Sequence, residues 1–484
     1  MEKKPAKAEN PGPGGPPTRG VATLLGDPKK AIVKLAIPMI VANLSHTIYN
    51  LTDAIWVSGK GPEALSAVGF FFPFHFMAMA LAGGVGIGAG AAISRQIGAK
   101  NKEGADNIAA HTIVIMLALV IPLTFLMLIL TEPILKGMGA TGDSLALSVS
   151  YARIMFSGLI LIFFTNIANS ILRSEGDARR AMYAMLAGAI LNIILDPIFI
   201  YTLGLGVVGA AWATIVSMFT VSLVVFYWLF IKKDTYVTFK FKGFRFIKWV
   251  LADIAKVGVP ASISQMSMSI MSFSITTIVA RVGGPDGVAV YITGWRVVSL
   301  ATLPMMGLAR AVTPVTAAAF GAKDYRKMET SYLFAIKLGV MIETGIALVT
   351  LLFASPITWI FTWSGESARL ADDLVLFLRM IWVFYPGVAF GMLSGAMFQG
   401  AGKGLNALIM TLIRTLVFNV PFAWFFGVYL DRGLKGVWIG MILASLAYIP
   451  IAFGWAYSYL QRLKNRAGLE SSTAGDLTEN RTVA

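Results

Sequence analysis

Long apolar segments, each separated from the next by a short polar loop, fill the chain from Ala31 to about residue 460. Each segment supplies the roughly 20 residues that a helix needs to cross about 30 Å of hydrocarbon. The pattern predicts twelve membrane helices, near residues 32–57, 66–92, 108–131, 148–171, 181–203, 207–231, 250–280, 287–318, 333–356, 373–398, 405–427 and 434–460. We therefore expect an all-α polytopic membrane protein with both termini on one side of the membrane.

The two halves of the chain repeat three short patterns in the same order. Residues 34–38 match 256–260, residues 98–100 match 321–323, and residues 206–209 match 433–436. Matched positions lie about 225 residues apart, and six helices per copy preserve the direction of the chain, so a pseudo-two-fold axis along the membrane normal should relate the copies. The repeat predicts two six-helix lobes, an N-lobe over residues 31–232 and a C-lobe over residues 249–463.

The remaining segments are polar. Residues 1–30 are rich in Lys, Pro and Gly without the apolar stretch of a signal peptide, and residues 464–484 are also polar. We predict that both are disordered cytosolic tails. Residues 233–248 are basic and predict a cytosolic linker between the lobes.

Composition agrees with a membrane protein, because 57% of the residues are hydrophobic and only 13% are charged. Most Lys and Arg fall in the loops of one side, and the positive-inside rule makes that side, with both termini, cytosolic. This explains the formal net charge of +15 without a nucleic-acid partner. The chain has no Cys, and its three His residues lack metal-ligand spacing. Catalytic and phosphate-binding motifs are missing too, so we expect that the protein is not an enzyme, needs no cofactor and is not driven by ATP. We also expect a monomer in the plasma membrane.

One apolar helix of the first half, residues 188–201, carries an amide and an acid one turn apart, Asn192 and Asp196. The i, i+4 spacing places both on one helix face. Pro197 follows and cannot donate the backbone hydrogen bond that the carbonyl of Ile193 would accept. An acid near the bilayer centre costs at least about 2.5 kcal/mol on insertion scales, so such residues usually bind or relay an ion. The pattern predicts a site for a small cation or a proton; ion pairing of Asp196 with a neighbouring helix is the alternative.

The first predicted helix carries a polar stripe at positions i, i+3, i+4 and i+7, formed by His46, Tyr49, Asn50 and Asp53. A stripe that polar should face protein or water and not lipid. Asp53 is the acid of this stripe and predicts a second carboxylate at the site. Pro38 lies about four helical turns earlier and predicts a kink that can tilt the helix.

Further polar residues concentrate in the first half. Tyr151 and Asn169 lie about five turns apart in the fourth predicted helix, which would place them on one face. Thr214 lies near the start of the sixth. Glycines at positions 84, 86, 88 and 90 predict close helix packing through small-xxx-small contacts.

The second half differs, because its seventh predicted helix has no acid and many Ser and Met residues. Glu343 in the ninth helix is the buried acid of this half. We interpret it as structural or gating, with Arg296 or Arg310 of the eighth helix as its expected partner.

These residues resemble the multidrug and toxic compound extrusion (MATE) transporters, over nearly all of residues 31–463. The matching positions are Pro38 and Asp53, the stretch from Asn192 to Pro197, and Thr214. The pattern is similar to the DinF-like prokaryotic branch, whose ion site lies in the N-terminal lobe. The NorM-like branch carries acids in its seventh and tenth helices, whereas Asp372 and Asp373 here fall at the outer edge of the tenth.

The resemblance implies a cation-coupled antiporter that exports cationic or amphipathic drugs by alternating access, with H⁺ or Na⁺ as the coupling ion. It implies that Asp53, Asn192, Asp196 and Thr214 form the Na⁺ or proton site. Tyr151 and Asn169 would line the substrate cavity, together with the stripe residues His46, Tyr49 and Asn50; Pro38 and Pro197 would serve conformational change. His46 departs from the uncharged residue expected at its position.

Two other functions remain open on the sequence. A lipid or lipid-linked oligosaccharide flippase of the same superfamily would share the fold, but should line its cavity with Arg and Lys to hold diphosphate. The first half offers no basic residue that we expect to be buried, whereas Arg296, Arg310, Arg379 and Arg414 of the second half keep this function open. A non-transporting receptor or accessory subunit is the alternative of another class.

Overall fold

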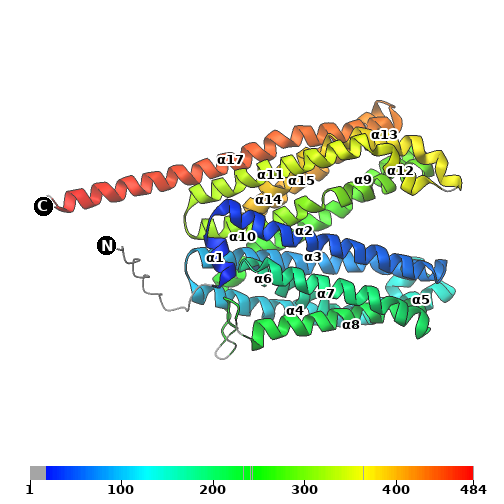
Figure 1. Cartoon of the computed structure of the whole chain (residues 1–484), viewed down its shortest axis with the longest axis horizontal. Coiled ribbons are helices and arrows are strands. Elements are labelled where there is room, and N and C mark those ends of the chain that lie inside the picture. Colours follow the sequence, from blue (N-terminus) through cyan, green and yellow to red (C-terminus); the bar gives the residue numbers. More distant parts are fainter. Residues whose placement is uncertain (1–17, 233, 240, 242–243, 364, 483–484) are drawn as a thin grey trace, which may run out of the picture.

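The computed structural model describes residues 18–232, 234–239, 241, 244–363 and 365–482, and these residues are predominantly helical (Figure 1). Ten helices are long and apolar enough to cross a membrane, or up to twelve if each of two bent pairs is one span. The expectation of an all-α polytopic membrane protein is confirmed, with ten to twelve candidate spans.

The first half contains eight α-helices and two short π-helices among its described residues. They are α1 (Arg19–Leu25), α2 (Pro28–Ser58), α3 (Pro62–Gly98), α4 (Lys102–Gly137), α5 (Gly142–Ser157), α6 (Leu159–Ser174), α7 (Ala178–Pro197), η1 (Ile198–Thr202), α8 (Gly206–Phe226) and η2 (Tyr227–Ile231). The second half contains α9 (Lys248–Ala301), α10 (Leu303–Gly321), α11 (Tyr325–Leu352), α12 (Ala354–Thr362), η3 (Gly365–Leu370), α13 (Ala371–Ile381), α14 (Phe384–Gly400), α15 (Gly404–Leu412), η4 (Ile413–Asn419), α16 (Val420–Trp424), η5 (Phe425–Tyr429) and α17 (Gly433–Thr482).

Several predicted spans are broken. The fourth bends by 45° between α5 and α6, and the tenth bends by 53° between α13 and α14. The predicted span 287–318 is divided between the end of α9 and α10. Gly284, with φ of +58°, breaks α9 where two predicted spans meet, in a conformation that only Gly adopts without strain.

The backbone reproduces the repeat that the sequence predicts. Lys100 and Lys323, at matched positions, share a left-handed conformation with φ of 57° and 55°. Gly206 and Gly433, which begin α8 and α17, have φ of +59° and +58°. A non-Gly residue with positive φ is uncommon, so its recurrence at matched positions confirms that the two halves share local structure.

Helices extend into both of the segments that the sequence predicts as tails. Within the predicted tail 1–30, α1 is capped by the Thr18 side chain and buries Val21 and Leu24. The Leu25 carbonyl accepts a hydrogen bond from Lys327 at 2.6 Å. At the other terminus α17 continues to Thr482, beyond the predicted end of the lobe at residue 463. A search for long apolar segments does not find a short helix with only two buried residues, so the sequence did not predict α1.

The two halves meet along a seam that is closest near one end of the bundle. This α1 end carries α1, the α3–α4 turn and the residues between η2 and α9, on the left of Figure 1. Across the seam α3 packs against α9 and α10, and α2 packs against α10. A Cβ added at Gly88 would lie 2.4 Å from the Ile254 carbonyl oxygen, and one at Gly84 would lie 2.7 Å from that of Gly258. The predicted small-residue packing is confirmed, because larger side chains would separate α3 from α9.

An ion pair joins the halves at the α1 end. The Arg95 guanidinium of α3 donates to Asp253 Oδ1 of α9 at 2.8 Å and to the Gly400 carbonyl of α14 at 3.2 Å. The Arg95 residue is only 7% exposed. The expectation that the first half has no buried basic residue is therefore wrong, because Arg95 lies where its helix meets the other half.

The described residues between η2 and α9 dock on the first half. The buried Glu175 carboxylate accepts the backbone N–H groups of Tyr236 and Val237 at 2.9 and 2.7 Å. Asp106 accepts the N–H of Thr238 at 2.8 Å. These carboxylates satisfy the extended backbone of the linker, which we predict only as a basic loop. Burial raises the pKa of Glu175 to about 7, although the two N–H donors act in the opposite direction.

Removing one partner of the seam ion pair should loosen the α1 end. In Asp253→Asn the Arg95 guanidinium loses a charge-assisted hydrogen bond worth about 2 kcal/mol. Spin labels at exposed Glu103 and Leu405, one in each half, should report a larger population of long distances. Asp286→Asn removes the exposed pair with Arg369 at the other end and should leave this distance unchanged. Identical distributions in Asp253→Asn and the unmodified protein would contradict the proposal that the pair closes the seam.

Docking of the linker should weaken as the pH rises. Glu175 ionises near 4.5 when released but near 7 when buried, so the docked state binds more protons between these values. Docking is strongest below pH 4.5, and it loses about 3 kcal/mol as the pH rises through 7. Hydrogen exchange at the Tyr236 and Val237 amides, corrected for intrinsic rates, should show this loss. Glu175→Gln should abolish the pH dependence, whereas Glu103→Gln at an exposed position should retain it.

Candidate functional site

The Asp196 carboxyl of α7 is buried with 0% exposure, and neither of its oxygens has a hydrogen-bond partner. Asn192, one turn earlier, is also buried, and its Oδ1 has no partner either. Its Nδ2 donates to the Thr214 hydroxyl of α8 at 3.3 Å. Three buried side-chain oxygens one turn apart on α7, one of Asn192 and two of Asp196, thus have no hydrogen-bond partner among the described residues.

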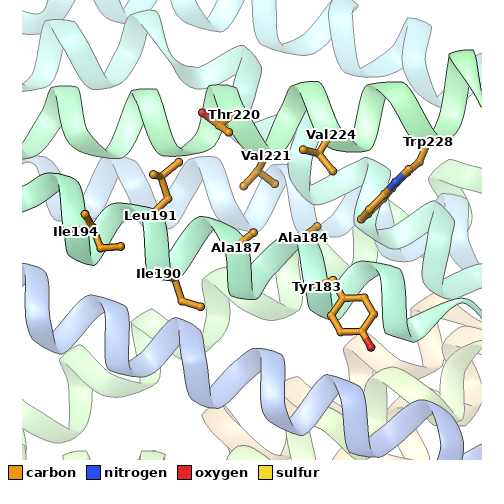
Figure 2. Close-up of a pocket in the computed structure, with 10 residues that line it drawn as sticks. All are labelled: Tyr183, Ala184, Ala187, Ile190, Leu191, Ile194, Thr220, Val221, Val224 and Trp228. Carbon is orange, nitrogen blue, oxygen red and sulfur yellow. The ribbon is translucent and has the colours of Figure 1, made fainter.

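The apolar residues of α7 explain why this face is buried. Ile190 and Ile194 are more than half exposed on the outside of the helix, whereas Asn192 and Asp196 face the protein. Figure 2 shows the outer face, where α7 and α8 border an apolar groove of about 490 Å³. Of the residues that we predict for the site, none lines this groove.

Pro197 ends the regular part of α7, and the chain continues as the π-helix η1. The N–H of Leu203 donates to the Ile198 carbonyl at 2.8 Å. A π-helix is rare, and single turns of it often occur beside functional sites, where they change the direction of the following residues. Pro197 thus lies where the helix changes type, directly after the acid.

The neighbouring helix α2 brings a second acid to the same place. Asp53 and Asp196 interact electrostatically, and both act on the hydroxyls of Tyr49 and Tyr151. Tyr49 also interacts with the Thr214 hydroxyl. The structure thus brings together residues of α2, α5, α7 and α8, namely Asp53, Asn192, Asp196, Thr214, Tyr49 and Tyr151. We call these six residues the acid cluster.

The polar stripe of α2 is divided between two environments. Tyr49 and Asp53 belong to the acid cluster, whereas Asn50 is exposed and its Nδ2 lies 3.0 Å from His46 Nδ1. The His46 ring packs edge-on against Tyr49 at 5.6 Å between centroids. Pro38 is buried within a helix that runs without a break from Pro28 to Ser58, so it does not interrupt α2.

Tyr151 and Asn169 lie on two different helices. Tyr151 and Asn169 cannot share the face of a straight helix, because Gly158 separates α5 from α6 and the two helices bend by 45°. Asn169 is buried and its Oδ1 has no partner, but no described interaction joins it to the acid cluster. Gly158, directly after Ser157, is the signal of this bend in the sequence.

Neither buried acid has a basic partner among the described residues. No described ion pair includes Asp196 or Glu343, so the alternative of an ion-paired Asp196 is not supported. The predicted pairing of Glu343 with Arg296 or Arg310 is wrong for the same reason. Arg310 instead faces Arg173 of α6, since the charges of these half-buried residues act on each other.

The sequence did not reveal how α2 and η1 are joined. The Tyr201 hydroxyl of η1 donates to the Trp56 carbonyl of α2 at 2.6 Å, and its ring lies 4.6 Å below the Lys60 ammonium. A Cβ at Gly59 would lie 2.3 Å from the Tyr201 hydroxyl oxygen. These contacts hold the ends of α2 and η1 together, within a few residues of Asp53 on α2 and of Asp196 at the end of α7.

The chemistry of the acid cluster suits a proton or a small monovalent cation. Two carboxyls, one amide oxygen and hydroxyl groups are hard oxygen donors, and three buried oxygens have no partner in the protein. Among the described residues no group of three or more His, Cys, Asp or Glu side chains could hold a metal ion.

Comparison with known proteins places this geometry in context. The sequence pattern of the MatE family matches residues 38–198 and 260–425. The multidrug export protein MepA of Staphylococcus aureus (strain MSSA476) is 29% identical over 422 residues, which cover 86% of this chain and 91% of MepA.

Solved structures are more similar in sequence. A multidrug resistance MATE family transporter of the MOP superfamily, in an outward-facing conformation, is 48% identical with a TM-score of 0.90, covering 93% of this chain and 99% of that one. A MOP superfamily transporter from Pyrococcus furiosus, described as having a binding pocket of reverse polarity, is 47% identical with a TM-score of 0.89, covering 92% and 99%.

Proposed function

The chain belongs to the MatE family of multi-pass membrane transporters, and we propose that it exports drugs in exchange for H⁺ or Na⁺. Cationic or amphipathic compounds are the proposed substrates, as the names of its relatives suggest. The observation that carries the proposal is the acid cluster, where Asp196 and Asn192 present three buried oxygens without partners.

The position of the acid cluster supports the DinF-like branch of the family. Its residues all lie in the first half of the chain, within the proposed N-lobe 31–232. The proposed C-lobe 249–463 contributes Glu343 on α11, which lies elsewhere. The basic loops support an orientation with both termini in the cytosol of the plasma membrane. The cytosolic side is then the α1 end, and we propose a monomer that lies among membrane lipids.

A mechanism follows from repulsion between the two acids. Asp53 on α2 and Asp196 on α7 lie close together, and two carboxylates that share one site repel each other, so H⁺ or Na⁺ would relieve the repulsion. With the acids neutralised, α2 can approach α7 while Tyr201 and Trp56 hold their far ends together. This movement would narrow the space beside Tyr151 and expel the substrate. The ion and the substrate then compete, because each of them favours a different position of α2.

One observation favours a second candidate substrate. Arg173 and Arg310 are half-buried, lie close to each other in opposite halves, and form no ion pair with any described carboxylate. Two unpaired guanidinium groups could hold an anionic head group, as expected of a lipid or lipid-linked oligosaccharide flippase. Movement of a fluorescent anionic lipid in proteoliposomes, lost in Arg173→Gln, would favour that function.

Drug efflux from proteoliposomes tests the proposal directly. Na⁺ and pH gradients are imposed separately on full-length protein, and export driven by one of them identifies the coupling ion. Export under neither gradient, with correctly folded protein, would favour a receptor or accessory subunit over a transporter.

Asp196→Asn should abolish coupled export while the protein still folds. The substitution removes a desolvated charge and keeps the shape of the side chain, so thermal stability should be equal or higher. Asp53→Asn should behave alike because the two acids titrate as a pair. Asp143→Asn at an exposed position should export normally. Gradient-driven export by Asp196→Asn at the unmodified rate would rule out the proposed site.

Drug and ion should inhibit each other's binding at equilibrium. Thermodynamic reciprocity requires the ion to weaken drug binding by the same factor that the drug weakens ion binding, typically about 5- to 150-fold. Titration calorimetry should show this effect in the unmodified protein and its loss in Asp53→Asn and Asp196→Asn. Drug affinity that is independent of both pH and Na⁺ would place the coupling site outside the acid cluster.

A further inference from the structure

The second half contains a buried acid that the proposed mechanism does not use. Glu343 of α11 has 0% exposure, and neither carboxyl oxygen has a hydrogen-bond partner. It lies on the stripe of α11 that also buries Gly339 and Ala347, and this helix packs against α14. Lys337 is exposed and on another face of the helix.

Its surroundings contain hydroxyl groups but no basic side chain. The charge of Glu343 acts on the Tyr385 phenol of α14, which in turn interacts with the Thr350 hydroxyl of α11. Tyr385 has 0% exposure, and its hydroxyl is also without a hydrogen-bond partner. Around it the described core is apolar and includes Ile381 and Trp438. Among the described residues no ion pair on the packed elements α2, α10, α12, α13, α14 or α17 reaches Glu343.

An ionised carboxylate in such a place would lack both water and a counter-charge. Burial of an unpaired charge is far more costly than burial of a neutral carboxyl, which also gains a donor O–H. A proton on Glu343 would avoid this cost. A metal cation would need more oxygen ligands than one carboxyl and two hydroxyl groups provide.

The position of Tyr385 connects this proton to the shape of the protein. Tyr385 lies in the first turn of α14, directly after the 53° bend that separates α13 from α14. A change in this bend would move the phenol relative to Glu343 on the neighbouring helix. Loss or gain of the proton and movement at the bend are then coupled, because each changes the free energy of the other.

We propose that Glu343, with Tyr385 and Thr350, forms a second proton-binding site in the second half of the transporter, coupled to the bend between α13 and α14. The acid cluster and this site lie in opposite halves, so one transport cycle would carry a proton at Glu343 in addition to the ion at Asp53 and Asp196. The proton is bound as O–H on the carboxyl and is released to water when the bend changes. The coupling to drug export rests on the proposed function, whereas the protonation of Glu343 does not.

Infrared spectroscopy of full-length protein in nanodiscs tests protonation. Carboxyl-labelled ¹³C-glutamate identifies bands from Glu, and a Glu175→Gln background removes the other buried glutamate at the α1 end. We expect one protonated glutamate carbonyl band at pH 8, absent in Glu175→Gln/Glu343→Gln. Tyr385→Phe should shift this band, and Glu329→Gln on the same helix should not. No band at pH 8, or a band unaffected by Glu343→Gln, would overturn the proposal without requiring any transport.

Proton counting tests the coupling. In proteoliposomes Glu343→Gln should lower the number of protons moved per drug molecule by about one relative to the unmodified protein, while Asp196→Asn abolishes export. An unchanged ratio in Glu343→Gln would overturn the coupling. Export that survives Asp196→Asn would instead overturn the proposed function, so the two failures are distinguishable. Glu329→Gln, on the same helix but outside this site, should retain the ratio.

Discussion

The cost of burying a carboxyl group without a counter-charge separates the acids of this protein into two classes. At the α1 end Glu175, Asp106 and Asp253 are each satisfied by backbone N–H groups or by Arg95. Inside the membrane-spanning helices Asp196 and Glu343 have neither. The first class contributes to structure by docking the linker and closing the seam. The second is strained unless a proton or cation neutralises it, which is the property that an ion-coupled transporter needs.

Small residues allow the two halves to pack closely against each other. Gly84 and Gly88 allow α3 to approach α9 so closely that the halves share one seam, and Arg95 lies at its end. Without a hydrophobic force between helices in lipid, such contacts depend on close packing and a few polar interactions. A seam of this kind can separate at modest cost, because it loses few charged contacts.

The repeat explains both the symmetry and its limits. Matched turns at Lys100 and Lys323 and at Gly206 and Gly433 show that the two halves share a backbone pattern. Their polar interiors differ: the first half gathers two acids, an amide and hydroxyl groups at one place, and the second retains Glu343 with Tyr385. Two copies of one scaffold thus carry different ionisable groups, which would let each half respond separately to ions.

The sequence by itself determined the class of protein and the repeat, and it predicted three central residues of the candidate site. The hydropathy of the sequence predicts helices long enough to cross a bilayer. An acid in such a helix is unusual whatever surrounds it, so Asp53, Asn192 and Asp196 could be selected from the sequence and their spacing alone. It could not reveal α1, which buries only two residues, or the bend at Gly158 that separates Tyr151 from Asn169. The partners of charged residues were also beyond it. Arg95 meets Asp253 across the seam, and Glu343 meets no basic group in the described part of the chain, because both outcomes depend on helices far apart in the sequence. Local patterns fix which side chains share a helix face, but only the packing of one helix on another decides which charges find a partner and which stay buried alone.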